Sequence, residues 1–219
     1  MRCPATAANY TWIRDVSNGM FLNAYCLTLV LGLTDEDLFE RLGVDEYVAT
    51  TGISEAANTS MEWLIEHGSE RFVAVTPVER GALMIEPGGI LGVTPAVALP
   101  LSEGHELVSH FRNVNAHGRF RWVRDGELRV EFDPMFPNVR RAGSTPDDLV
   151  DEMAAVGFDV APSHAGAAET DSRFADLSEP WVGPVAGSFA LAERLTRVAV
   201  SRELLDEATF FCGEPRSLE

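Results

Sequence analysis

The stretch that most constrains the fold is residues 24–31, AYCLTLVL, which is apolar at almost every position. Alternate side chains of a strand point to opposite faces of a sheet, and here both faces are largely apolar. A strand of this kind is typical of the interior of a sheet that is covered on both sides. We therefore expect residues 24–31 to form a buried, central strand.

Helix signals lie on both sides of this strand. Residues 33–43 predict a short helix with Thr34 as N-cap, acidic residues in the first turn and Gly43 as its end. Residues 54–67 predict a longer helix that ends at Gly68. The residues expected on the inward face of the longer helix are Ala57, Met61, Leu64 and Ile65.

Later helices are predicted by the same signals. Residues 145–157, TPDDLVDEMAAVG, combine Thr145 as N-cap, proline at the first helical position and a glycine end. Thr94 and Pro95 open a short helix that Pro100 should keep short. Residues 189–198 and 201–206 resemble two closing helices.

Strands fill the remaining apolar segments. Residues 72–77 and 82–86 flank a three-residue hairpin loop at 79–81, and residues 105–112 lead into a second hairpin at 118–133. Hairpins combined with helices before, within and after them predict an α+β fold. We expect one mainly antiparallel sheet of about five or six strands.

The second hairpin, GRFRWVRDGELRVEFD, has two possible registers. A two-residue loop would place Trp122 opposite Arg129. A three-residue loop at 124–126 would place Trp122 opposite Leu128 and Phe120 opposite Val130, so that all large apolar side chains share one face. Since a one-residue slip moves side chains to the wrong face, the hydrophobic pattern favours the three-residue loop with a bulge.

In that register Arg119 faces Glu131 and Arg121 faces Arg129, with all three arginines pointing outward. Residues 112–141 carry a net charge of +3 within a chain whose formal net charge is −17. Two readings remain open. The arginines form a solvated face neutralised by nearby acids, or Arg119, Arg121 and Arg129 form an anion- or partner-binding site, because an anion can bridge two guanidinium groups.

Length and composition predict one α+β domain over residues 1–219, with residues 161–172 as a mobile loop. No stretch is long and apolar enough to predict a membrane span, and the first ten residues lack a secretory signal. Three cysteines, Cys3, Cys26 and Cys212, indicate a reduced, cytoplasmic protein. The acidity argues against general nucleic-acid binding, which needs a basic surface.

Sequence motifs predict no catalytic residues, no metal site and no cofactor. No nucleophile elbow, phosphate loop, dinucleotide fingerprint or zinc-protease motif occurs. His105 and His110 are close in sequence but should point to opposite faces of one strand, which is poor geometry for a shared metal.

Three blocks carry a resemblance to a known family. They are residues 24–34 (AYCLTLVLGLT), residues 110–116 (HFRNVNA) with the hairpin that follows, and residues 190–196 (ALAERLT) with 203–205 (ELL). The chain resembles a family of actinobacterial proteins of unknown function. That resemblance implies a cytosolic, single-domain protein and assigns no activity or site residue.

Two hypotheses for the function follow. The first is a non-enzymatic interaction module, of an immunity type or a regulatory type, since a strongly acidic protein docks readily on a basic partner. The alternative is a small-molecule-binding or enzymatic domain with a pocket between the sheet and the helix at 54–67. Whether the protein is an enzyme, and its oligomeric state, are left open by the sequence.

Overall fold

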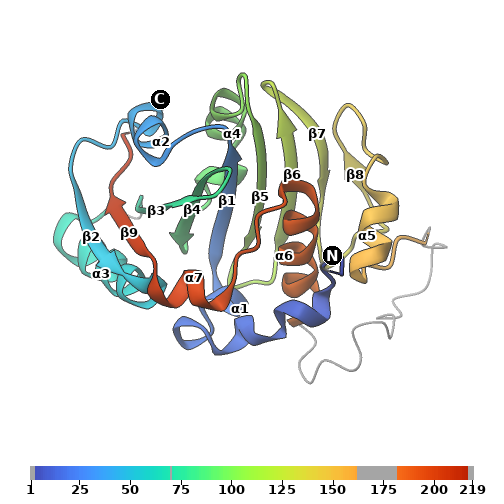
Figure 1. Cartoon of the computed structure of the whole chain (residues 1–219), viewed down its shortest axis with the longest axis horizontal. Coiled ribbons are helices and arrows are strands. Elements are labelled where there is room, and N and C mark those ends of the chain that lie inside the picture. Colours follow the sequence, from blue (N-terminus) through green and yellow to red (C-terminus); the bar gives the residue numbers. More distant parts are fainter. Residues whose placement is uncertain (1–2, 70, 162–181, 217–219) are drawn as a thin grey trace.

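A computed structural model describes residues 3–69, 71–161 and 182–216, and the strands of these ranges form one antiparallel sheet (Figure 1). The α+β class and the antiparallel sheet are confirmed, but the sheet has nine strands rather than five or six, in the order β2-β9-β3-β4-β1-β5-β6-β7-β8. The strands are β1 Tyr25–Leu31, β2 Tyr47–Thr51, β3 Val73–Val78, β4 Gly81–Pro87, β5 Glu106–Arg112, β6 Gly118–Arg124, β7 Glu127–Phe132, β8 Arg141–Ala142 and β9 Thr209–Gly213.

β1 is the central strand that its sequence predicts. It pairs with β4 on one side and β5 on the other, and all seven of its residues are buried. The missed strands are β2, β8 and β9. β9 comes from the end of the chain and lies between β2 and β3, a pairing that no local pattern specifies.

Helices and 3-10 turns cover both faces of this sheet. They are η1 Ala7–Asp15, η2 Ser17–Gly19, α1 Met20–Asn23, α2 Asp35–Leu42, α3 Gly52–His67, η3 Leu91–Val93, α4 Pro95–Leu101, α5 Val150–Val156, α6 Val182–Thr196 and α7 Arg202–Glu207. The larger apolar cluster lies beneath η1, α3, α5, α6 and α7, and the smaller beneath α2 and α4. We call the two sides the α6 face and the α2/α4 face. Figure 1 shows α6 crossing in front of β6.

The capping signals of α2 are confirmed. The hydroxyl of Thr34 accepts a hydrogen bond from the backbone N–H of Asp37 at 3.1 Å, and Gly43 ends the helix in the left-handed conformation with φ of 65°. This helix therefore begins and ends where its own residues dictate.

The long helix α3 is confirmed, but two of the four residues predicted on its inward face, Met61 and Ile65, are exposed. Met61 and Ile65 are 59% and 77% exposed, whereas Ile53 and Ala56 near the start of the helix are buried. Ala57 and Trp63 are partly buried against the core, so α3 faces the core along another stripe than predicted and leaves Met61 and Ile65 on its outer side.

The helix predicted at 145–157 begins later than expected. Residues 146–149 form turns, and α5 starts at Val150. Thr145 caps no helix; its backbone N–H donates to the carbonyl of Arg129 at 3.0 Å. The hydroxyl of Thr145 points to the same carbonyl at 3.5 Å, so this loop is held against β7 and the hydroxyl caps no helix. The predicted mobile loop at 161–172 lies, after Ala161, outside the described residues.

The β3–β4 connection is shorter than predicted. Val78 pairs with Gly81, which leaves Glu79 and Arg80 as a two-residue turn. Gly81 does not supply a left-handed turn residue; a Cβ at this position would lie 2.0 Å from the carbonyl oxygen of Val30. Glycine is needed here because the neighbouring strand approaches so closely.

No helix in the described ranges is long and apolar enough to cross a membrane.

Candidate functional site

The arginine-rich hairpin of β6 and β7 turns at Asp125 and Gly126. Arg124 pairs with Glu127, so the loop has two residues, not the three that we predicted. The φ angles of Asp125 and Gly126, 51° and 74°, are both positive, as the tightest hairpin turn requires. A bulge further along β7 restores the apolar pattern, because Trp122 pairs with Val130 and Val123 with Leu128, leaving Arg129 as the extra residue.

This bulge separates side chains that the sequence predicts on one face. Phe120, Trp122 and Val130 contribute to the core of the α6 face, as expected. Leu128 packs with Val123 on the opposite, α2/α4 face, so its predicted position is wrong. The prediction failed because it treated both strands as regular. The extra residue in β7 changes the pairing only on the side of the bulge away from the turn, so Val130 lies opposite Trp122 while Leu128, nearer the turn, lies opposite Val123.

Arg121 lies opposite Glu131 and not opposite Arg129. It does not point outward into solvent: the residue is only 6% exposed, and its Nε forms a very close ion pair with Oε2 of Glu131. Ser109 of β5 lies on its other side in the sheet. Arg121 is thus a nearly buried cation paired with a carboxylate, and removing it should cost more stability than removing an exposed arginine.

Arg119 and Arg129 also have acidic neighbours. Arg119 lies 3.8 Å from the same oxygen of Glu131, and Arg129 contacts Glu127 at 3.0 Å and Asp148 at 3.9 Å. Nε of Arg129 is buried and has no hydrogen-bond partner within the described ranges. An anion bound by these arginines would compete with three carboxylates, and the anion site itself stays a prediction.

Two buried polar groups lie outside the sites that the sequence predicts. Tyr25 Oη and His110 Nδ1 form a hydrogen bond of 2.8 Å in the core of the α6 face, where His110 also packs edge-on against Phe189. Nε2 of His110 is buried without a hydrogen-bond partner in the described chain. Burial lowers the pKa of His110 to about 3, so the ring is neutral at physiological pH.

Glu86 is the second such group, on the α2/α4 face. Its carboxylate accepts backbone N–H groups of Leu91 at 2.7 Å and Gly92 at 2.8 Å, which ties η3 to the sheet. Burial raises the pKa of Glu86 to about 7, although these two hydrogen bonds oppose the shift. The sequence signal for this contact was weak: an acidic residue at the end of an apolar strand, followed within a few residues by Gly88, Gly89 and Gly92.

The two edges of the sheet differ in a way that bears on binding. β8 has only two residues, so it presents few free backbone groups to which another strand could pair. β2 has five, four of them exposed, and Tyr47 and Val48 are 56% and 46% exposed. Tyr47 stacks on Phe39 at a ring separation of 5.2 Å, so the open edge carries an ordered aromatic side chain. The β-branched and aromatic residues of YVATT were the overlooked signal.

A cavity of about 590 Å³ opens at the C-terminal end of α6. The β3–β4 turn, the segment after α6 and the N-terminal residues around Cys3 surround it. A second cavity of about 390 Å³ lies between α2 and α4. α3 lines neither of these cavities, so the larger one is not where we expected a pocket. In the described ranges no group of three His, Cys, Asp or Glu side chains could hold a metal.

In a comparison with protein families, nearly the whole length of the chain matches one family model. Residues 3–217 match the model of DUF6461, described as a family of unknown function, and the chain belongs to this family. Comparison with curated proteins gave no match, and comparison with solved structures gave none either.

Proposed function

We propose that this member of DUF6461 is a non-enzymatic interaction module that binds a basic protein partner along the open edge of β2. The observation that carries the proposal is the contrast between the two sheet edges. An exposed edge strand presents unpaired backbone groups, and proteins normally shorten, charge or cover it. β8 is shortened, whereas β2 is five residues long and exposes Tyr47 and Val48.

The charge of the protein indicates the kind of partner. The formal net charge of −17 opposes pairing of β2 with a second copy of the same chain. Glu46, directly before β2, has no ion pair within the described ranges, and a basic partner strand would supply one. Addition of an extended segment to a sheet edge is a common mode of recognition, with backbone hydrogen bonds for affinity and side-chain contacts for specificity.

The helix that follows β2 in the chain also exposes apolar side chains. α3 packs against β2 and exposes Met61 and Ile65 on its outer side. Binding of this kind suits a regulatory or immunity-type protein, which acts by covering its target. The proposal includes a cytoplasmic setting, which the free state of Cys3, Cys26 and Cys212 supports.

The test uses pull-down from native extract with three forms of the protein. Val48→Lys places a charge on the β2 edge, which disfavours strand pairing and repels a basic partner. Val139→Lys, at a residue 66% exposed in the turn between β7 and β8, is the matched control with the same charge change. The partner that is retained is then purified, and its affinity is measured as salt is raised.

The proposal predicts a stoichiometric basic partner that wild type and Val139→Lys retain and Val48→Lys loses. Its affinity should fall with rising salt, because exposed charges attract it. Equal retention by all three forms, or a partner whose binding is insensitive to salt, would refute the proposal.

A further inference from the structure

The cavity at the end of α6 has a wall of mixed chemistry. Pro77, Val198 and Leu204 contribute apolar surface, while Glu79, Glu193 and Arg197 contribute charge. Its volume of about 590 Å³ falls within the range of about 300–1,000 Å³ that is typical of small-molecule sites.

The charged groups of this wall are not all engaged with one another. Glu193 accepts a hydrogen bond from the hydroxyl of Tyr10 through Oε2, at 2.7 Å, and this leaves Oε1 available. Arg194, also in the wall, is paired closely with Glu152. Arg197 and Glu79 are exposed to solvent and have no side-chain ion pair or hydrogen bond with any residue in the described ranges. The cavity therefore offers one unpaired guanidinium and two carboxylate groups with free oxygens.

The backbone at Arg197 supports a role for its side chain. Arg197 has φ of 63°, and its N–H donates to the carbonyl of Glu193 at 2.8 Å. This is the position directly after a helix where glycine is strongly preferred, because other residues are strained in the left-handed conformation. A glycine here would make the same backbone bond without strain, so arginine at this position carries a cost in stability.

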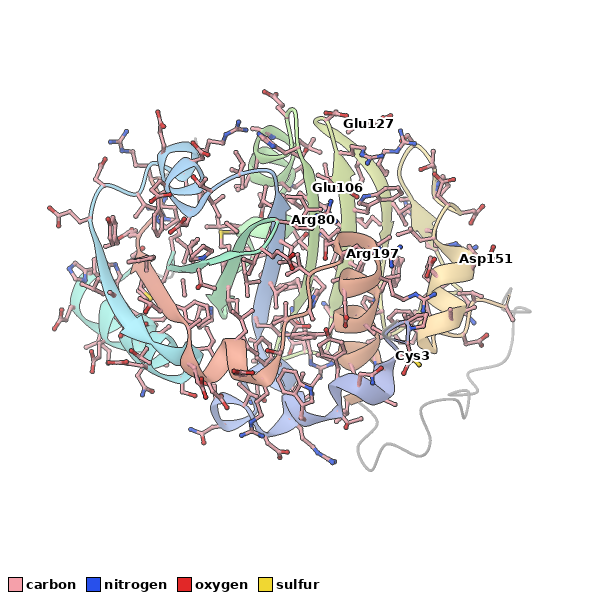
Figure 2. The ribbon with its side chains drawn as sticks, in the orientation of Figure 1. Cys3, Arg80, Glu106, Glu127, Asp151 and Arg197 are labelled. Atoms are coloured by element: carbon pink, nitrogen blue, oxygen red, sulfur yellow. The ribbon has the colours of Figure 1, made fainter. Side chains whose placement is uncertain are left out.

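The helix end that carries Arg197 is held firmly. Nη1 of Arg80, in the β3–β4 turn, donates to the carbonyl of Thr196 at 2.7 Å, and Figure 2 shows Arg80 and Arg197 in this region in front of the sheet. The hydroxyl of Thr196 accepts the N–H of Val198 at 3.2 Å. Arg197 is thus presented from a held backbone, and a ligand has to order only its side chain.

We propose that this cavity binds a small zwitterion of the amino-acid class with an apolar side chain. The carboxylate of the ligand pairs with Arg197, since guanidinium and carboxylate groups match in charge and geometry. Its ammonium group binds Glu79 and Oε1 of Glu193, and its side chain lies against Pro77, Val198 and Leu204. This site is separate from the β2 edge and does not depend on the function proposed there.

The test measures binding of L-leucine and L-phenylalanine by calorimetry, at up to about 5 mM ligand, which detects dissociation constants to about 1 mM. For leucine, 4-methylpentanoate lacks the ammonium group and 3-methylbutylamine lacks the carboxylate. We expect the zwitterion to bind at least tenfold more tightly than either analogue. Absence of binding by both amino acids, or equal binding of leucine and one analogue, would overturn the proposal.

Variants separate a binding role of Arg197 from a structural one. Arg197→Gln should weaken amino-acid binding at least tenfold. Arg197→Gly should weaken it equally while raising the melting temperature by about 2–4 °C, because glycine relieves the left-handed strain. Arg202→Gln, at an exposed arginine of α7 outside the cavity wall, should bind as wild type does. Unchanged binding in both Arg197 variants would refute the assignment.

Discussion

Arg121 and Glu131 lie directly opposite each other in the β6–β7 hairpin and form an ion pair, with the side chain of Arg121 only 7% exposed. This pairing follows from a bulge at Arg129. It converts an arginine that the sequence places on the surface into a buried cation that depends on one carboxylate.

Removal of either partner should therefore destabilise the protein. Arg121→Ala should cost about 1–3 kcal/mol and Glu131→Ala should cost more, because it leaves a nearly buried guanidinium without its carboxylate. Unfolding in urea measures both, and a double-mutant cycle isolates the pair. Arg202→Ala, which breaks an exposed pair with Asp206, should change stability by less than about 0.5 kcal/mol. A change at Arg121 as small as this control would contradict its burial.

The apolar residues of the hairpin should differ in their contributions. Phe120 is fully buried and stacks on Phe132 at a ring separation of 5.1 Å, so Phe120→Ala should cost about 3–5 kcal/mol. Trp122 is only half-buried, and its indole N–H donates to Glu106 at 2.7 Å. Trp122→Ala should cost less than Phe120→Ala in the same urea experiment. The reverse order would mean that the register of β6 against the core is wrong.

Glu86 should make stability fall as pH rises. Its pKa in the folded protein is raised to about 7 from 4.5, so between these values the folded state holds a proton that the unfolded chain has lost. The stabilisation is present below about pH 4.5 and disappears as pH passes 7, and a difference of this size corresponds to roughly 3 kcal/mol. Because His110 contributes an opposite slope below about pH 6.5, the decline is measured as the difference between wild type and Glu86→Gln in urea unfolding across pH 5–8.

Substitution at Glu86 provides the check. Glu86→Gln cannot ionise and should lose this decline, while being less stable than wild type at pH 5 because its amide N–H₂ group faces a backbone donor. Glu62→Gln, on the exposed surface of α3, should keep the wild-type profile. A profile for Glu86→Gln that parallels wild type would rule out Glu86 as the source.

His110 should make the protein less stable as pH falls, which is the opposite of the effect of Glu86. Its pKa is lowered by burial to about 3 from 6.5, so the unfolded chain takes up a proton that the folded state refuses. Stability should fall as pH drops below about 6.5, with a slope approaching about 1.4 kcal/mol per pH unit. Between about pH 4.5 and 6.5 this slope opposes that of Glu86, so the contribution of His110 is the difference between wild type and His110→Phe.

The control for this experiment is a histidine outside the core. His67→Ala, at the exposed end of α3, should follow the wild-type profile in acid, whereas His110→Phe should lack the acid-dependent loss. His110→Phe also leaves the hydroxyl of Tyr25 without its partner, so its stability at pH 7 should be lower by about 1–3 kcal/mol. An acid slope in His110→Phe equal to that of wild type would contradict the assignment.

Features encoded by neighbouring residues could be predicted from the sequence. The apolar alternation of residues 24–31 identifies β1 as a central strand, and the caps at Thr34 and Gly43 define α2. In both cases the deciding interaction joins residues within one turn or one strand. The α+β class follows from the same local signals, because each signal predicts one helix or one strand without reference to the other elements.

What the tertiary structure decided depends on contacts between distant segments. β9 lies between β2 and β3 because its backbone pairs with strands more than a hundred residues away, and this leaves β2 as the open edge. Arg121 is buried because a bulge sets which residue lies opposite it, and Arg197 lines a cavity because α6 ends beside the β3–β4 turn. Local sequence specifies the period and the ends of an element, but burial and pairing depend on what other elements place against it.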